Sequence, residues 1–389
     1  MKRLSIAALI LCLLLCGCAA PAVNTTVPPA TTAPVTVPPT TAAPTTAPAT
    51  EPTTEPTTEP TTEPTTAPTE PPVLYRSPLT GEPLDEPMTA RPFAVMLNNV
   101  RQAMPLCGAS EADIIYEVSM EGGLTRCMGV FSDIASVESL GSIRSARKYF
   151  VSLAMSYDAI YVHYGKSDVP GSDVGAQQYM DETGWNHMDG TSRGYSYFYE
   201  NEDRKYDGYS AEHRHFLVGS RAVDYAKNNG FALTRSEPLD YGLQFAEDRI
   251  LVGKNAEKLT VWFNYGGTPS SHNKATKLIY DSASGKYLSY QYGEENVDGN
   301  TGETLSFTNV LVLRTPTRRY QDTELLYVDV VGSGTGYYAC NGQIIPISWS
   351  RYSAYDPFVY TMENGTELTL SVGKTYVAVV PTNATVTYE

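Results

Sequence analysis

The fold is decided by the stretch IIYEVSMEGGLTRCMGVF, which occupies residues 114–131. Apolar and polar residues alternate from Ile114 to Glu121, and this period of two is typical of a half-buried β-strand. The pair Gly122-Gly123 then fits a two-residue turn, and residues 124–131 form an apolar returning strand. The sequence therefore predicts an antiparallel β-hairpin.

The register of this hairpin places three charged side chains on one face. A two-residue turn pairs Glu121 with Leu124 and Ser119 with Arg126, so that Arg126 lies diagonal to Glu117 and Glu121. An ion-pair ladder and a site for a polar ligand both fit this arrangement, and the ladder is the simpler interpretation. The two carboxyl groups would lie roughly 13 Å apart along the strand, which is too far for a glycosidase pair.

Strands and helices alternate around the hairpin. Residues 91–97 form a short apolar strand of the buried type, which ends at Asn98-Asn99. Ser145 is the predicted N-cap of a helix that runs to about Ser156, and residues 158–164 form another apolar strand. A second amphipathic helix is predicted at residues 221–229. These elements indicate a mixed α/β layer.

The chain changes character after about Arg249, where helical periodicity is nearly absent. Short strands are predicted at residues 258–264, 275–281, 287–292, 308–314, 325–331, 336–340, 367–370 and 375–380. The predicted fold class is therefore α+β, with an N-terminal mixed α/β domain followed by a strand-rich, mostly all-β C-terminal domain. Residues 169–216 form a long connection, which indicates a functional surface or an unrecognised helix.

Four segments are predicted along the chain. They are a lipoprotein signal peptide at residues 1–18, a disordered Pro/Thr-rich linker at 19–72, the N-terminal domain at 73–245 and the C-terminal domain at 246–389.

The signal peptide has a positive start and an apolar run. Lys2 and Arg3 precede residues 4–15, a run too short to span a bilayer by itself. Gly17 before Cys18 is the pattern that lipoprotein signal peptidase cleaves, so Cys18 is expected to become the acylated N-terminus. The predicted location is the extracytoplasmic face of the cell membrane, with the lipid bilayer as a partner through Cys18.

The linker consists almost wholly of Pro, Thr and Ala, with Pro-Thr-Thr-Glu repeated between Glu51 and Glu63. Such a composition cannot bury apolar surface, and its prolines favour polyproline II. At roughly 3.1 Å per residue the linker would reach on the order of 150 Å. This length suits a spacer through a thick cell wall.

The net charge of the chain is strongly negative. Without Lys2 and Arg3 the basic residues fall from 28 to 26 against 43 acidic residues, a net charge of −17. Binding of nucleic acid is therefore not expected, and an anionic ligand would need a local basic pocket.

Three cysteines lie outside the signal peptide: Cys107, Cys127 and Cys340. Their odd number and the lack of CxxC spacing favour buried free thiols over a zinc site. At most one disulfide can form, and a bond between Cys107 and Cys127 is an open alternative.

Arg144 and Arg147 lie at the start of the first predicted helix. Guanidinium groups beside helix-terminal N–H groups form a good site for phosphate or carboxylate. The alternative is internal pairing with Glu117, Glu121 or Asp113.

The histidine pattern His213-x-His215 could hold a metal from an extended segment, with Asp168 or Asp173 as a further ligand. This spacing alone is weak, and structural roles are the favoured interpretation. His163, at the end of a buried strand, is the most informative single histidine. No metal and no cofactor is predicted.

Two further patterns are interpreted as structural. Gly332-x-Gly334-x-Gly336 resembles a dinucleotide fingerprint, but a strand follows it instead of a helix, so its glycines are assigned to turns. Trp349, with Tyr352 and Tyr355 nearby, fits either core packing or an aromatic platform for a sugar ring.

The chain resembles the YerB-like lipoproteins of Gram-positive bacteria. The matching motifs are Arg91-Pro92, Ala94-Val95-Met96, Asn98-Asn99, Ala112-Asp113-Ile114, Tyr116-Glu117, Glu121-Gly122-Gly123, Thr125-Arg126, Arg144-Ser145-Ala146-Arg147 and Tyr157-Asp158-Ala159, followed in the C-terminal part by Thr301-Gly302, Asn309-Val310, residues 332–336, Trp349 and Gly373-Lys374-Thr375. Where the family tends to read Pro-His-Asn, this chain reads Glu212-His213-Arg214. The resemblance implies the two-domain architecture and the membrane address, and no reaction.

These patterns predict a ligand-binding surface on the tethered body. Its residues are Asn98, Asn99, Glu117, Glu121, Arg126, Arg144, Arg147 and His163. The predicted partners are peptidoglycan, teichoic acid or an envelope protein. The alternative function is a hydrolase or transferase acting on a cell-wall polymer, in which the arginines hold an anionic group and Asp113 or Glu117 is the acid/base.

Overall fold

The computed structural model describes residues 75–169, 174–191, 197–247, 249–263 and 274–389. The predicted signal peptide, the linker and Cys18 lie outside these residues. Among the described helices, none is long and apolar enough to cross a membrane.

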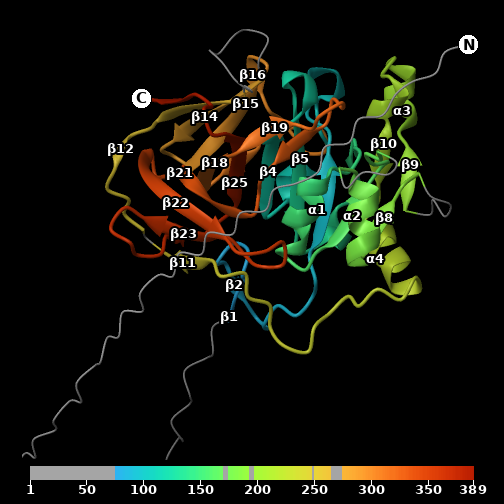
Figure 1. The fold of residues 1–389 in the computed structure, drawn as a ribbon, viewed down its shortest axis with the longest axis horizontal. Helices are drawn as coiled ribbons and strands as arrows, with labels where there is room; N and C mark the ends of the chain where they lie inside the picture. Colours follow the sequence, from blue (N-terminus) through green and yellow to red (C-terminus); the bar gives the residue numbers. More distant parts are fainter. Residues whose placement is uncertain (1–74, 170–173, 192–196, 248, 264–273) are drawn as a thin grey trace, which may run out of the picture. The chain divides into compact units, whose positions relative to one another are not determined.

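A mixed sheet of eleven strands is the central element of the fold (Figure 1). In spatial order its strands are β12 (Lys254–Asn255), β22 (Gln343–Arg351), β21 (Gly332–Cys340), β18 (Asn309–Thr315), β25 (Thr375–Pro381), β4 (Ile114–Ser119), β5 (Thr125–Phe131), β3 (Phe93–Leu97), β7 (Ile160–His163) and β8 (His187–Asp189), with β23 (Val359–Met362) paired to β22. The strand-rich second half confirms the predicted α+β class.

Strands from both halves of the sequence meet at β25. This strand is buried along its whole length and pairs in parallel with β18 on one side and with β4 on the other. An apolar run of this kind is typical of a parallel strand covered on both faces. One sheet therefore contains strands from both sides of residue 245, while the boundary predicted there stays a prediction.

A second sheet covers one face of the large sheet. Its strands are β16 (Glu294–Glu295), β15 (Lys286–Gln291), β14 (Ala275–Asp281), β13 (Lys258–Trp262) and β26 (Val386–Tyr388), with β17 (Ser306–Phe307) paired to β15. Leu259, Val261 and Leu278 share a core with Val310 and Ala378 of the large sheet. Alternate residues of β13, β14 and β15 are buried, as expected for a sheet with one solvated face.

Two of the described helices lie on the other face of the large sheet, whereas Ala222 and Ala226 of a third helix share the core of the second sheet. Phe150 and Leu153 of α1 (Lys148–Met155) pack with Val377 and Val379 of β25, and α1 contacts α2 (Ala176–Thr183). The remaining helices are α3 (Glu202–Tyr206) and α4 (Gly219–Asn228). The second predicted helix is thus confirmed as α4, and the long connection contains α2 and α3, which sequence reasoning did not locate.

The first predicted helix starts later than expected. Its N-cap is Arg147, without a side-chain cap bond, instead of Ser145. The residues before it stay extended because Ile143 bridges to Leu97 and Ala146 bridges to Lys166. Strand-like pairing therefore wins over the capping preference of Ser145.

The predicted hairpin is present, but its register is shifted. Ser119 pairs with Thr125 instead of Arg126, and residues 120–124 form the loop. Gly122 and Gly123 both have positive φ angles in this loop, a conformation that favours glycine. Because side chains alternate along a strand, the one-residue shift moves Arg126 to the face opposite Glu117. The predicted ladder between these two residues is therefore wrong.

Several smaller predictions are settled by packing. The glycines of residues 332–336 lie inside β21 instead of in turns, and a Cβ on Gly336 would come within 2.1 Å of the Val312 carbonyl oxygen. Trp349 is buried and donates its indole N–H to the Arg314 carbonyl oxygen at 3.1 Å, which identifies it as a core residue.

The three cysteines are free thiols. Cys127 and Cys340 are buried, whereas Cys107 is half-buried. The disulfide between Cys107 and Cys127 is not formed in this structure.

Candidate functional site

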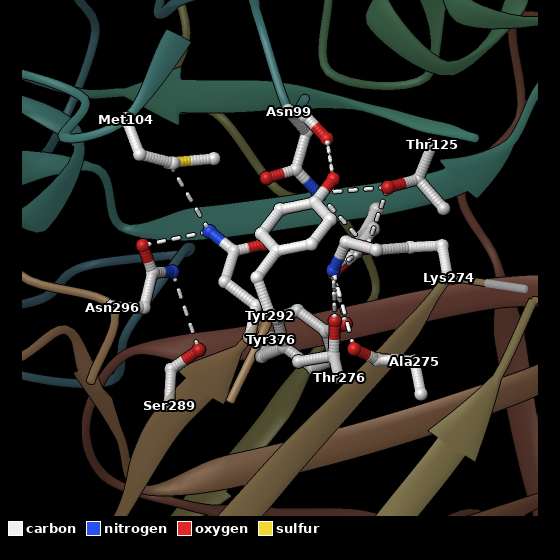
Figure 2. Close-up of polar contacts among 12 residues, drawn as sticks. Asn99, Met104, Thr125, Lys274, Ala275, Thr276, Ser289, Tyr292, Asn296 and Tyr376 are labelled. Atoms are coloured by element: carbon white, nitrogen blue, oxygen red, sulfur yellow. Dashed lines mark hydrogen bonds and ion pairs between the residues drawn. The ribbon is translucent and has the colours of Figure 1, made fainter. Parts of the chain in front are cut away.

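One face of the hairpin carries a buried network that we call the Glu117 cluster. Its members are Glu117, Lys274, Asn99, Thr125, Thr276 and Tyr376. The side chains of Glu117 and Lys274 form an ion pair at 3.0 Å and are only 3% and 1% exposed. Figure 2 shows Asn99 and Thr125 facing Lys274 and Thr276 across this network.

The carboxylate of Glu117 is saturated with donors. They are Lys274 (3.0 Å), Thr125 (2.7 Å) and Asn99 (2.9 Å) on Oε1, and Thr276 (2.8 Å) and Tyr376 (2.6 Å) on Oε2. Burial alone raises the pKa of Glu117, but Lys274 and the hydroxyl donors outweigh burial and hold that pKa below its usual value. Glu117 is therefore an ionised structural group with little capacity to exchange a proton.

The cluster joins the two sheets. Glu117 and Thr125 come from β4 and β5 of the large sheet, and Thr276 comes from β14 of the second sheet. Lys274 was not among the predicted site residues. The alternation of β14 is the signal that could have found it, because Lys274, Thr276 and Leu278 fall on one face and Leu278 is apolar.

The opposite face of the hairpin carries the arginine cluster, which we define as Arg126, Arg144, Arg147 and Glu121. Arg126 is only 6% exposed, and its one hydrogen bond to a described residue goes from Nη1 to the Ser145 carbonyl oxygen. Within the described part of the chain no carboxylate pairs with it. A guanidinium has five N–H donors, and most of those of Arg126 bond no described residue. They are not among the fully buried atoms that lack a partner, so solvent or a small ligand can reach them.

The other two arginines have carboxylate partners of unequal quality. Arg147 pairs with Glu121 at 3.3 Å, and both side chains are about one-sixth exposed. Arg144 reaches the Glu212 carboxylate only at 3.9 Å and donates to the Glu212 carbonyl oxygen at 3.3 Å. The predicted internal pairing is thus present for Arg147 through Glu121 and does not involve Glu117.

Burial and like charge act together on Arg126. Burial, followed by the charges of Arg147 and Arg144, lowers the pKa of Arg126 to about 9. The pKa of Arg144 is lowered for the same reasons, although Glu212 opposes the shift. An anion placed among the three guanidinium groups would relieve this repulsion.

The remaining predicted residues lie in two other environments. Asn98 bonds Ser142 Oγ at 3.2 Å and His213 Nδ1 at 2.9 Å. His163 is fully buried and bonds the Gly165 carbonyl oxygen at 2.8 Å and His187 at 3.0 Å.

His163 is a neutral core group. Burial lowers its pKa to about 4, although the nearby Asp189 carboxylate opposes this effect. The structure therefore divides the eight predicted residues among four environments: Asn99 and Glu117 in one, the three arginines with Glu121 in a second, Asn98 in a third and His163 in a fourth.

The predicted metal ligands are engaged in other contacts. His213 bonds Asn98, and the ring of His215 stacks on Tyr164 with 3.7 Å between centroids. Asp173 lies outside the described residues. Among those that are described, no three His, Cys, Asp or Glu side chains are grouped to hold a metal ion.

The proposed acid/base pair does not converge on the arginines. Asp113 precedes β4 and accepts the Ser132 backbone N–H at 2.7 Å, and burial raises its pKa. The arginine cluster instead contains Glu121, which follows β4. A strand of six residues spans about 20 Å, so Asp113 and Glu121 lie at opposite ends of the hairpin.

Comparison with known proteins gives two family matches in order along the chain. The model described as "Protein of unknown function (DUF3048) N-terminal domain" matches residues 79–232, and the corresponding C-terminal domain matches residues 268–377. The chain is 26% identical over 311 residues to YerB of Bacillus subtilis (strain 168), whose name carries a provisional assignment as a lipoprotein. This match covers 79% of the chain and 86% of the relative.

A solved structure shows the same fold. The crystal structure of YerB from Bacillus subtilis superposes with a TM-score of 0.67 at 25% sequence identity. The superposition covers 80% of this chain and 99% of YerB.

Proposed function

The chain belongs to the YerB-like lipoprotein family, whose two domains it carries in order. On this premise we propose that it is a lipid-anchored, extracytoplasmic protein. We further propose that its arginine cluster binds an anionic group of the cell envelope. The anchor would be the acylated Cys18, and the Pro/Thr-rich linker would hold the body away from the membrane. The relationship to a lipoprotein supports this address.

The observation that carries the proposal is the isolation of Arg126. A buried charge is normally compensated by an opposite charge or by a full set of hydrogen bonds, because its desolvation is unfavourable. Arg126 is 6% exposed, and among the described residues it bonds a single carbonyl oxygen. A phosphate or carboxylate could accept two parallel N–H bonds from this guanidinium.

The neighbours of Arg126 suit the same ligand. Arg144 keeps 24% of its side chain exposed, so the cluster has an edge that solvent reaches. Glu121 pairs with Arg147 and would compete with an incoming anion for this guanidinium. The site is therefore expected to favour a doubly charged phosphate or a polymer with several acid groups over a single weak acid.

A hydrolase or transferase acting on a cell-wall polymer is the rival function. It needs Asp113 or Glu117 as acid or base beside the arginines. Glu117 lies on the opposite hairpin face with five donors, and Asp113 lies at the other end of the hairpin. Binding without catalysis at this cluster therefore fits the geometry better.

Sedimentation of the full chain with purified peptidoglycan and with teichoic acid tests the proposal. Wild-type protein is expected to bind at least one polymer, and Arg126→Met is expected to weaken this binding by about tenfold or more. Lys227→Met, on the exposed side of α4, is the matched control for loss of a positive charge. Equal binding by wild type and Arg126→Met, or indifference to both polymers together with no crosslinked envelope protein, would contradict the proposal.

A further inference from the structure

A groove of about 740 Å³ lies on the solvated face of the second sheet. This volume falls within the range of small-molecule sites. Thr260 of β13, Lys277 of β14 and Tyr290 of β15 are cross-strand neighbours along its floor. Arg101 and Leu124, from the N-terminal half, complete the lining.

Aromatic rings form much of the groove. Trp262, Tyr290 and Tyr292 line it, and all three are partly buried. Tyr292 is held in place because its hydroxyl donates to the Asn99 carbonyl oxygen at 2.7 Å and Lys274 Nζ lies 4.9 Å from its ring centroid. Figure 2 shows this ring beside Lys274. Rings with a fixed orientation present flat apolar surface at low entropic cost.

The charge of the groove is opposite to that of the chain. The described lining contains Arg101, Lys274 and Lys277 and no acidic residue, whereas the whole chain has a net charge of −15. Lys274 is neutralised by Glu117, and Arg101 pairs with Glu294 at 3.2 Å on the exposed rim.

Lys277 differs from these two cations. It is exposed and has no carboxylate partner within the described residues. It lies between Thr260 and Tyr290 in the register of the sheet and lines the same groove as the three aromatic residues.

We propose that this groove binds a saccharide that carries an acid group, either a carboxylate or a phosphate. The apolar face of a sugar ring would lie against Trp262 and Tyr290, and the acid group would pair with Lys277 and Arg101. The indole N–H of Trp262, which has no bond to a described residue, would donate to a sugar hydroxyl. This site is separate from the arginine cluster and does not depend on it.

Three probes that differ in their acid group determine whether the groove prefers a carboxylate or a phosphate. Glycan strands with N-acetylmuramic acid supply the carboxylate, teichoic acid supplies the phosphate, and a neutral N-acetylglucosamine oligomer of the same length supplies neither. Each probe is titrated into the full chain in detergent micelles, and its dissociation constant is measured by calorimetry, with quenching of tryptophan fluorescence as a second readout.

The proposal predicts binding of at least one acidic probe, weakened about tenfold by Trp262→Ala and about three- to tenfold by Lys277→Gln. Lys277→Gln should bring the affinity for the acidic probe close to that for the neutral oligomer. Lys227→Gln is the control on a distant exposed lysine.

Two further comparisons separate binding in the groove from binding at the arginine cluster. Because the acidic polymers can also bind the arginine cluster, the groove variants are compared in an Arg126→Met background, in which binding in the groove should persist. Trp262→Ala should leave binding of inorganic phosphate at the arginine cluster unchanged. In the Arg126→Met background, equal affinity for the neutral and acidic probes, or an affinity that Trp262→Ala leaves unchanged, would overturn the groove proposal.

Discussion

The two faces of the β4–β5 hairpin differ in how far their buried charge is compensated by hydrogen bonds and opposite charge. On one face Glu117 accepts four hydrogen bonds and forms an ion pair with Lys274. On the other face Arg126, one position after Thr125 in β5, is almost as buried and bonds one carbonyl oxygen among the described residues.

The difference separates a structural charge from a candidate binding charge. A saturated ion pair between two sheets fixes their relative position, because breaking it leaves an uncompensated charge in the core. A buried cation with unused donors gains from a partner that the described residues do not supply. This is the reason for assigning ligand binding to Arg126 and scaffold function to Glu117.

The comparison is tested most severely by removing Lys274. Lys274→Met should lower the free energy of unfolding by about 3–5 kcal/mol, since it leaves the Glu117 carboxylate buried without its counter-ion. Chemical denaturation of the variant measures this loss. Adding Glu117→Gln should recover a large part of it, and a double variant as unstable as Lys274→Met would show that the ion pair is not the cause.

His163 is a third buried titratable group, and unlike Glu117 and Arg126 it is neutral in the folded protein at pH 7. Its pKa falls from an unfolded value near 6.5 to about 4 in the folded protein. Between these values the unfolded chain binds a proton that the native protein does not, so stability falls as the pH is lowered through this window. The loss attributable to His163 is about 3 kcal/mol between pH 7 and pH 4.

Denaturation as a function of pH checks this prediction. The slope of stability against pH should be smaller in His163→Gln than in wild type between pH 4 and pH 6.5. An identical slope in the two proteins would show that His163 does not titrate on unfolding in this range.

Replacing Arg126 should have the opposite sign to replacing Lys274. Arg126→Met removes a buried charge that has one hydrogen-bond partner, so stability is expected to stay the same or rise by about 1–3 kcal/mol. The matched control is Arg351→Met. Arg351 is 2% exposed but donates to the carbonyl oxygens of several residues, so its loss should destabilise the protein. Equal destabilisation by both variants would make Arg126 a structural residue.

The smallest effect concerns Glu121. Glu121→Gln weakens the grip on Arg147 and removes a competing negative charge, so affinity for inorganic phosphate should rise about two- to threefold. The effect is small because both partners are partly exposed. Calorimetric titration measures it, and a lower affinity in the variant would indicate that Glu121 positions Arg147 for the ligand.

Much of the fold could be predicted from the sequence because its signals are local. Alternation located the hairpin and most strands of the second half, and amphipathic periodicity located α4. The start of α1 could not be predicted, because the extension of residues 143–146 depends on bridges to Leu97 and Lys166.

The site was harder to predict because it depends on register. The pair Gly122-Gly123 suggested a two-residue turn, and the five-residue loop that forms instead moves Arg126 to the other face. The partnership of Glu117 with Lys274 joins positions 157 residues apart, since 274 − 117 = 157, and no local pattern specifies it. The three arginines lie together in the structure, but the lack of a carboxylate partner for Arg126 among the described residues became visible only in three dimensions.

Thermal unfolding of the full chain with and without inorganic phosphate, at constant ionic strength, tests the central claim most directly. A ligand that binds only the folded state raises the unfolding midpoint. The account predicts that phosphate raises the midpoint of wild type by about 2–4 °C and leaves that of Arg126→Met unchanged, although this variant is at least as stable without phosphate. An equal rise in both proteins, or no rise in wild type, would contradict the assignment of Arg126 as a binding residue.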